Sequence, residues 1–163
     1  MSEIPEVEPR IPVKLTKLRP GEGQRIREVW PVPVQKTESR LKRGDLCYLG
    51  VVNDKAVSYH WVQTSGSHFV QPAGKDMVLN QGQFMIYHTR VDEKVKGKRI
   101  NPFVICTLLK ELKEAGYHQG LIYTASTNQA NQRSLERVGF RKILQVKSLR
   151  IGKRFYSNWK ASI

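Results

Sequence analysis

The chain has 163 residues, a length that fits one globular domain with a core of its own. Hydrophobic residues make up 39% of it and charged residues 26%, values that argue against wholesale disorder. No apolar run approaches the roughly 20 residues that a membrane-spanning helix needs. The first residues also lack the apolar stretch of a secretory signal. We therefore expect a cytoplasmic protein with no membrane span.

The formal net charge of +14 and the pI near 10.0 point to an anionic partner. A nucleic acid, an anionic membrane surface and a phosphorylated small molecule would each use this charge. Basic residues are dense after Arg141, where no acidic residue occurs. No RNP, KH or helix-turn-helix pattern favours nucleic acid, so that partner is the less favoured one.

The cysteine content gives no sign of a metal site. Cys47 and Cys106 lie far apart inside apolar segments, and the chain has no CxxC pair and no Cys/His cluster. Free cysteines in apolar segments behave as small buried hydrophobic residues. We expect two buried thiols and no metal cofactor.

The first half of the chain predicts a tail, a strand, helical turns and a hairpin. Residues 1–12 contain proline and glutamate without periodicity, and we expect a flexible tail there and a single domain over residues 13–163. The next elements are a strand at 11–19, helical turns at 23–30 and 36–44, and hairpin strands at 45–53 and 55–64.

The second half alternates strands with helices after a Ser/Gly/Pro-rich connection. The expected strands are 83–91, 120–127, 142–152 and 153–161, and the expected helices are 100–116 and 128–139. Pro102 suits the first turn of the longer helix and Gly116 its end. Strands alternating with helices indicate a mixed sheet with at least one parallel pairing.

The segment between the strand ending at Val91 and the helix starting near Ile100 has the features of an anion site. Amides at a helix N-terminus bind phosphate, and four basic residues surround this one: Lys94, Lys96, Lys98 and Arg99. The alternative is a solvated basic loop that only connects two elements. Neither a P-loop nor a dinucleotide fingerprint is present, because the segment has one glycine, Gly97.

Two blocks together resemble the GNAT family of acyl-CoA N-acyltransferases. The run VDEKVKGKRI before a long helix is similar to the family's acyl-CoA signature, in the Gly-x-x-Ile-x-Pro form of one subgroup. The run TNQANQRSLERVGF is similar to a later family block, in which an asparagine precedes Gly-Phe by eleven positions. The resemblance covers about residues 45–150. It implies an α/β (α+β) fold with a mixed, mostly antiparallel sheet of six to seven strands flanked by helices.

The resemblance also implies acetyl-CoA, or another acyl-CoA, as cosubstrate. The residues that it assigns to cofactor binding are Val91, Lys96, Gly97, Lys98, Arg99, Ile100, Asn101 and Asn128. Two departures stand out. Arg99 and Asn101 occupy positions of the family's glycines, and Leu135 occupies the position of a tyrosine that protonates the leaving thiolate in many members.

Transfer to an amine needs a base for the amine and a proton for the leaving thiolate. His88 and Tyr87, on the strand that ends at Val91, are the base candidates, and Tyr123 is a substitute proton donor. The alternative for His88 is an ordinary strand histidine. His60 and Glu93 are weaker candidates, whereas His68 and His118 read as loop positions.

Three functions follow from these features. The first is an N-acetyltransferase acting on an amine of a small molecule, sugar or peptide, with an anionic acceptor and a homodimer left open. The second is an inactive GNAT-fold binding or regulatory domain, supported by Arg99 and Leu135. The third is a basic nucleic-acid-binding protein, supported by the charge alone.

Overall fold

The computed structural model describes residues 3–152 and 154–161, apart from the side chains of residues 150 and 155. Its centre is a five-stranded sheet in the order β1-β2-β3-β6-β7. These strands are β1 (Lys14–Lys17), β2 (Leu46–Val52), β3 (Lys55–Gln63), β6 (Gln83–Val91) and β7 (Gln119–Ile122). Neighbouring strands are antiparallel except β6 and β7, which run parallel. The mixed, mostly antiparallel sheet predicted from the sequence is confirmed.

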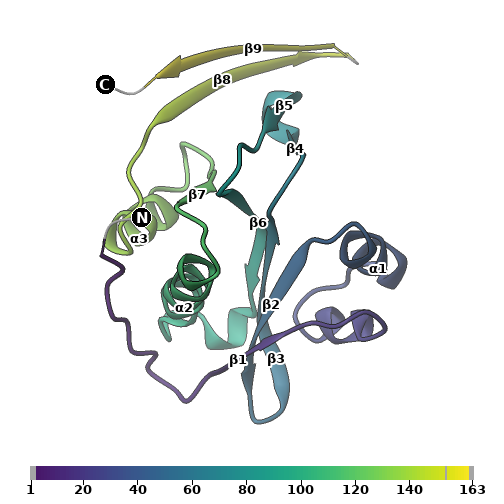
Figure 1. Cartoon of the computed structure of the whole chain (residues 1–163), viewed down its shortest axis with the longest axis vertical. Helices are drawn as coiled ribbons and strands as arrows, with labels where there is room; N and C mark the ends of the chain where they lie inside the picture. Colours follow the sequence, from purple (N-terminus) through teal and green to yellow (C-terminus); the bar gives the residue numbers. More distant parts are fainter. Residues whose placement is uncertain (1–2, 153, 162–163) are drawn as a thin grey trace.

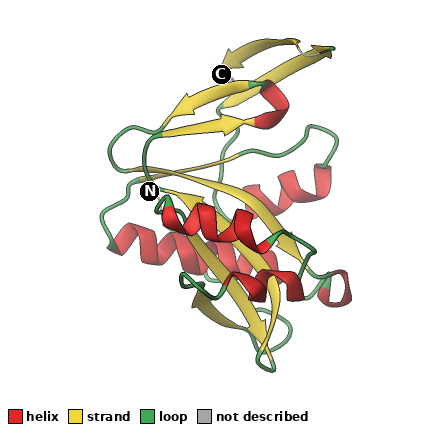
Figure 2. Ribbon diagram, turned by 90° about the vertical axis from the view of Figure 1, so that its right-hand side faces the viewer, coloured by secondary structure: helices red, strands yellow, loops and turns green. Residues whose placement is uncertain are grey.

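Helices cover both faces of this sheet (Figures 1 and 2). The longest, α2 (Ile100–Glu114), connects β6 to β7 and lies on the same face as α3 (Gln129–Arg137). The short η1 (Gly23–Glu28) and α1 (Val34–Lys42) lie on the other face. We refer to these as the α2 face and the α1 face.

Each face of the sheet buries its own hydrophobic cluster, because alternate residues of a strand point to opposite sides. On β3, Val62 joins the cluster beneath α2, and Trp61 joins the cluster beneath η1. On β6, Ile86 and Met85 divide in the same way. The helices are therefore held to the sheet by opposite sets of side chains from the same strands.

The number of strands in the central sheet was predicted wrongly, since five are present and not six to seven. The strands β8 (Leu144–Ile151) and β9 (Arg154–Ala161) pair only with each other among the described residues. They form a hairpin that lies beyond the small sheet of β4 (Ser67–Val70) and β5 (Lys75–Val78) in Figure 1. Alternating side chains specify a strand but not its partner, so the sequence could not show this separation.

The hairpin is attached to the rest of the molecule beside η2 (Gln71–Ala73), which joins β4 to β5. The Ser148 hydroxyl donates to the Pro72 carbonyl over 2.6 Å. The Lys75 ammonium lies 5.5 Å from the centre of the Trp159 ring. The two hairpins therefore support one another at one end of the central sheet.

The segment before β1 packs along the α2 face. Ile4, Val7 and Ile11 contact the cluster beneath α2, and the Arg10 amide donates to the Lys98 carbonyl over 2.8 Å. The predicted domain boundary after residue 12 stays a prediction. Both cysteines are buried and free, as predicted. No helix in the described part of the chain is long and apolar enough to cross a membrane.

Candidate active site

The parallel strands β6 and β7 stop pairing with each other halfway along β6. Their pairing runs from Gln83 opposite Gln119 to Ile86 opposite Ile122, where β7 ends. The strand β6 continues to Val91 along β3 alone. Beyond Ile86, the side of β6 that faced β7 has no strand partner among the described residues, so its backbone polar groups are open to a ligand.

A bulge lies in this unpaired part of β6. Tyr87 is opposite Trp61 and Arg90 is opposite Tyr59, so two residues of β6, His88 and Thr89, face one residue of β3. His88 has a φ of 45°, a left-handed conformation that a histidine rarely adopts. Bulges of this kind redirect side chains next to active sites. Here the bulge interrupts the alternation of side chains between the two faces of the sheet, and His88 within it is exposed.

The loop that follows β6 contains two residues with left-handed backbone. It contains η3 (Glu93–Val95), then Gly97 with a φ of 79° and Arg99 with a φ of 60°, and α2 begins at Ile100. Left-handed residues alternating with ordinary ones make amide nests that bind anions. The first amides of α2 have no intrahelical partner and add the positive end of the helix dipole.

The predicted cofactor-binding residues Val91 and Lys96 to Asn101 therefore share one loop, but their side chains differ in surroundings. Lys96 makes an exposed ion pair with Glu93 over 3.0 Å. The Lys98 carbonyl accepts from Arg10, which fixes the loop to the N-terminal segment. Among the described residues, no hydrogen bond joins the Asn128 side chain to this loop.

The start of α2 is tied to the sheet by a buried histidine. His60 is 0% exposed, and its Nε2 lies 2.8 Å from Asn101 Oδ1. The oxygen accepts, so Nε2 carries the proton and Nδ1 is left without a partner among the described residues. Burial lowers the pKa of His60 to about 4, opposed by the hydrogen bond to Asn101. His60 is neutral near pH 7 and acts here as an anchor for the loop.

The second family-like block begins at Thr127, a few residues after β7 ends at Ile122. The Asn128 side chain accepts from the Asn131 amide over 3.1 Å and caps α3. The Asn131 side chain donates to the Thr124 hydroxyl over 3.0 Å, which holds α3 against the segment after β7. Leu135 is buried in the cluster beneath α2. It contributes packing and offers no proton.

On the α1 face, the three predicted catalytic residues gather around a histidine that the sequence did not single out. The His68 ring lies 4.8 Å from the Tyr87 ring and 5.8 Å from the Tyr123 ring, measured between centroids. The Tyr87 and His88 rings are 5.6 Å apart. The prediction of His68 as a loop residue was wrong, because it lies buried on β4. We call these four residues the aromatic cluster.

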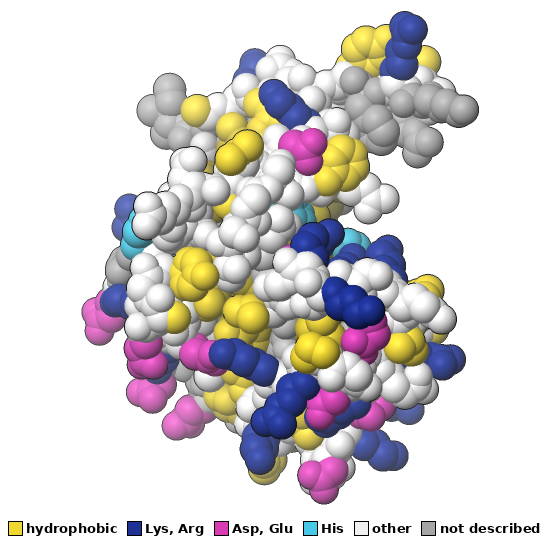
Figure 3. Space-filling model, turned by 45° about the vertical axis from the view of Figure 1, so that its right-hand side comes forward, with side chains coloured by type: hydrophobic (Ala, Val, Ile, Leu, Met, Phe, Trp, Pro, Cys, Tyr) yellow, Lys and Arg dark blue, Asp and Glu magenta, His cyan; other side chains and the backbone are white. Residues whose placement is uncertain are grey.

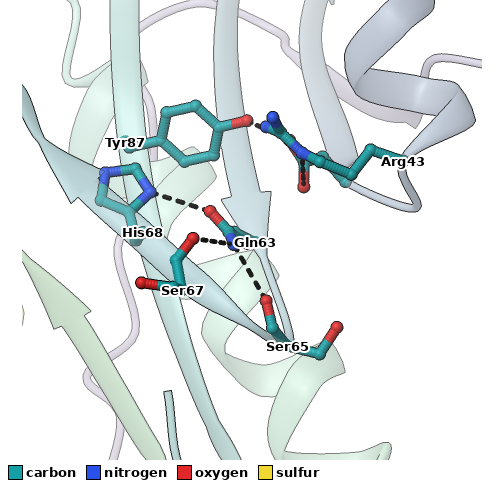
Figure 4. A network of polar contacts seen from close by, with 7 residues as sticks. Arg43, Gln63, Ser65, Ser67, His68 and Tyr87 are labelled. Atoms are coloured by element: carbon teal, nitrogen blue, oxygen red, sulfur yellow. Dashed lines mark hydrogen bonds and ion pairs between the residues drawn. The ribbon is translucent and has the colours of Figure 1, made fainter. Parts of the chain in front are cut away.

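Hydrogen bonds fix the orientation of His68 (Figure 4). Its Nδ1 lies 2.9 Å from Gln63 Oε1, and the Gln63 amide nitrogen donates to the carbonyls of Ser65 and Ser67 over 2.9 and 3.0 Å. The Gln63 oxygen can only accept, so His68 Nδ1 carries the proton. The other ring nitrogen, Nε2, is buried without a partner among the described residues. It is a bare acceptor beside Tyr123.

The Tyr87 hydroxyl is already committed to a structural partner. It donates to the Asp45 carboxylate, which also pairs with Arg43. Burial, followed by the hydrogen bond to Asp45, raises the pKa of Tyr87 well above its ordinary value. Tyr87 is therefore unsuited to remove a proton, and its role is to position the ring against His68 and His88.

His88 and Tyr123 have the protonation states that transfer to an amine needs. Partial burial of the ring by its neighbours, then the charges of Arg40 and Lys36, lowers the pKa of His88 to about 4, so this histidine is neutral near pH 7 although its surface is exposed. Burial raises the pKa of Tyr123, which keeps its proton. The cluster thus joins proton-accepting imidazoles to a proton-carrying phenol at the point where β6 and β7 part.

A surface hollow lies elsewhere, at the β1 edge. It encloses about 570 Å³ and is lined in part by Lys17, Tyr48 and Glu111. Lys17 pairs with Glu111, and Tyr48 donates to the same carboxylate over 3.4 Å. The polar groups of these three side chains are satisfied by one another. We therefore place the candidate site at the parting of β6 and β7.

Solved structures share this fold. No protein-family model matches the chain, and none of the curated proteins compared with it does. The ribosomal-protein-S18-alanine N-acetyltransferase of Escherichia coli matches with a TM-score of 0.64 at 13% identity, over 83% of this chain and 81% of that one. The chain has the GNAT fold.

Two further GNAT structures show the same likeness. The ribosomal-protein-alanine N-acetyltransferase of Brucella melitensis biovar Abortus 2308 has a TM-score of 0.62 at 14% identity, over 86% of this chain and 100% of that one. The aminoglycoside acetyltransferase AAC(6')-Iy has a TM-score of 0.63 at 12% identity, over 79% and 90%. Identities this low show the GNAT fold alone, so the activity rests on the residues of the site.

Proposed function

We propose that the protein is an acyl-CoA-dependent N-acyltransferase that moves an acetyl group from acetyl-CoA to an amine of a small molecule, sugar or peptide. The observation that carries this proposal is the juxtaposition of unpaired β6 backbone with the left-handed loop that opens α2. Free strand backbone suits a pantetheine chain, and an amide nest suits a pyrophosphate. The AAC(6')-Iy structure, which has the same fold, holds a bisubstrate analogue that contains CoA.

In this proposal the amides of Gly97 and of Arg99 to Asn101 bind the pyrophosphate, because the Lys98 amide already donates to the Val95 carbonyl. The side chains of Lys96 and Lys98 add positive charge. Pro102 has no amide and only shapes the turn. Arg99, with a φ of 60°, keeps the left-handed backbone that a glycine would supply. The departure of Arg99 from the family glycine is then a change of side chain only. The Gly-x-x-Ile-x-Pro subgroup and a cytoplasmic site of action belong to the same proposal.

The proposed reaction is a simple acyl transfer. The neutral amine nitrogen attacks the thioester carbonyl carbon, a C–N bond forms, and the C–S bond breaks. His88 accepts the proton from the amine, and Tyr123 donates a proton to the leaving thiolate. Backbone N–H groups near the bulge of β6 stabilise the carbonyl oxygen as its negative charge develops.

Calorimetric titration with acetyl-CoA and CoA tests the cofactor part. Gly97→Ala should weaken binding about tenfold, because a residue with Cβ disfavours a φ of 79° and distorts the amides. Gly116→Ala is the matched control, since Gly116 has a φ of 90° at the other end of α2. A Cβ at either position meets nothing within 4 Å, so both changes act through the backbone alone. Absence of heat from the wild type at sub-millimolar CoA would refute the proposal.

One observation favours a second function, a GNAT-fold domain that binds CoA without turnover. Leu135, at the position of the family's proton-donating tyrosine, is 6% exposed and serves the core. A thiol-release assay with a broad panel of amines separates the two functions. Release that falls in Tyr123→Phe supports the enzyme, whereas CoA binding with no release from any amine supports the binding domain.

A further inference from the structure

Arg40 is the cation at the centre of the α1 face of the site. It lies half-buried in the last turn of α1, with Cζ 5.2 Å from the centroid of the Trp61 ring and 5.3 Å from that of Tyr87. No carboxylate of the described residues forms an ion pair with it. Two aromatic faces hold the guanidinium in place, while its five N–H donors remain available.

Arg43, one turn further along the chain, has the carboxylate partner that Arg40 lacks. Arg43 pairs with Asp45, and the hydrogen bond between them raises the pKa of the guanidinium. Asp45 is 4% exposed and also accepts from the Tyr87 hydroxyl. The one buried carboxylate near the cluster is thus already occupied, so the positive charge of Arg40 is not neutralised within the described chain.

The surroundings of Arg40 make this side of the site positive. Lys36, one turn earlier on α1, adds its charge to that of Arg40 at His88. Figure 3 shows Lys and Arg side chains gathered with histidine where the surface is hollowed below the hairpins. A recess lined by one sign of charge attracts ligands of the opposite sign and repels polycations.

We propose that the acceptor amine carries an oxyanion group, a carboxylate or a phosphate, and that Arg40 binds this group. The inference rests on the acyltransferase function proposed above and names its substrate class. The guanidinium and the His88 ring both lie against Tyr87, 5.3 and 5.6 Å from its centroid. An oxyanion on Arg40 therefore places an amine of the same small molecule, or of the same chain terminus, beside His88.

The preference for an oxyanion follows from the shape of the guanidinium. Its planar N–H groups match carboxylate and phosphate oxygens in pairs, and the interaction is stronger where Trp61 and Tyr87 exclude water. An amine with several positive charges would meet Arg40 and Lys36 without a free carboxylate to bind it. The acceptor class is therefore an amino acid-like or phosphorylated amine and excludes polyamines.

The anion site can be tested without knowing the acceptor. Inorganic phosphate and, separately, acetate are titrated into the full chain while the His88 ring protons are followed by NMR. In the wild type, we expect a saturable shift, because an anion on Arg40 neutralises a charge that His88 senses. Arg40→Gln should abolish the shift, and Lys42→Gln, which removes an exposed charge from the same turn, should leave it unchanged. No saturable response in the wild type, or an equal one in Arg40→Gln, overturns the inference.

Turnover tests the acceptor class. With acetyl-CoA, thiol release is compared for β-alanine against propylamine, O-phosphoethanolamine against ethanolamine, and spermidine. The oxyanion member of each pair should have a kcat/KM about tenfold higher, and the pair with the larger ratio identifies the oxyanion. This ratio should fall below about threefold in Arg40→Gln. It should persist in part in Arg40→Lys, because lysine keeps the positive charge, and this second variant serves as the test if Arg40→Gln does not fold.

The two proposals fail in distinguishable ways. If calorimetry shows no CoA binding by the wild type, the acyltransferase function fails, whatever the anion titration shows. If CoA binds and the uncharged amines are acetylated as fast as their oxyanion partners, only the inference about Arg40 fails. Equal CoA affinity in the wild type and in Arg40→Gln shows that the variant acts on the acceptor side.

Discussion

At the end of β6, the α2 face and the α1 face of the sheet satisfy their polar groups in different ways. On the α2 face, the loop before α2 offers backbone amides, and one side-chain contact, His60 to Asn101, anchors it. On the α1 face, side chains from separate elements bond to one another, and β6 contributes one of them, Tyr87. The participants on that face are Arg43, Asp45, Gln63, His68 and Tyr87.

The difference bears on how each side tolerates substitution. An amide nest depends on φ and ψ, so Arg99 can stand in place of a glycine as long as its backbone stays left-handed. A side-chain network depends on every member, because each loss leaves a buried donor or acceptor unpaired. We therefore expect side-chain substitutions to have small effects on the α2 face, where the cofactor is proposed to bind, and large effects on the α1 face, where the acceptor is proposed to bind. His60 is the exception on the α2 face.

The largest effect is expected at His60, and it appears as a pH dependence of stability. The pKa of His60 in the folded chain, about 4, lies below the ordinary histidine value of 6.5, so as the pH falls the unfolded chain takes up a proton at a higher pH than the folded chain does. The contribution of neutral His60 to the free energy of unfolding is fully present above pH 6.5 and is lost as the pH falls to 4. His60 alone should lower the free energy of unfolding by about 3 kcal/mol between pH 7.5 and pH 4.

Urea unfolding of the wild type and His60→Gln at several pH values measures this effect. Glutamine can still donate to Asn101 but does not titrate, so its free energy of unfolding should fall less steeply with acid. His88 contributes a loss of the same sign in both proteins and cancels in the difference. Parallel pH profiles for the two proteins would show that His60 is not the buried neutral anchor described here.

The next effect is expected at Asp45, where the side-chain network of the α1 face is broken at its centre. Asp45→Ala leaves the buried Tyr87 hydroxyl without an acceptor and Arg43 without its partner. We expect the free energy of unfolding to fall by about 2 kcal/mol, because Arg43 is largely exposed and recovers water. Asp45→Asn keeps an acceptor for Tyr87 and should cost about half as much. An unchanged urea midpoint in Asp45→Ala would contradict the network.

The features that the sequence predicted are those with a local cause. The strand ending at Val91, the basic loop and the start of α2 follow from β-branched residues, one glycine and a proline within a few positions of each other. The helix predicted at 128–139 is observed as α3, with Asn128 as its cap, for the same reason. His88, Tyr87 and Tyr123 could be named as candidates from the sequence because they lie on or next to predicted strands, and their catalytic roles stay predictions.

The features that the sequence did not predict depend on contacts between distant segments. His68 lies in a four-residue strand, too short for the alternation of buried and exposed residues to be recognised. In the sequence, Arg40 cannot be distinguished from the many other basic residues. Its position over the Trp61 and Tyr87 rings depends on the fold. The separate β8–β9 hairpin likewise depends on partner choice, which alternation within one strand leaves open.

The smallest effect is expected at the exposed pair of Lys96 and Glu93, and it is the sharpest test of the contrast between the two faces. Their side chains are 75% and 76% exposed, so water screens the 3.0 Å contact. Glu93→Gln should change the free energy of unfolding by less than about 0.5 kcal/mol in urea. Lys96→Gln should weaken CoA binding by less than about tenfold in calorimetry, since one screened charge is lost and the amides remain. A loss well beyond tenfold would mean that side chains, and not backbone amides, hold the cofactor, and the contrast would then be wrong.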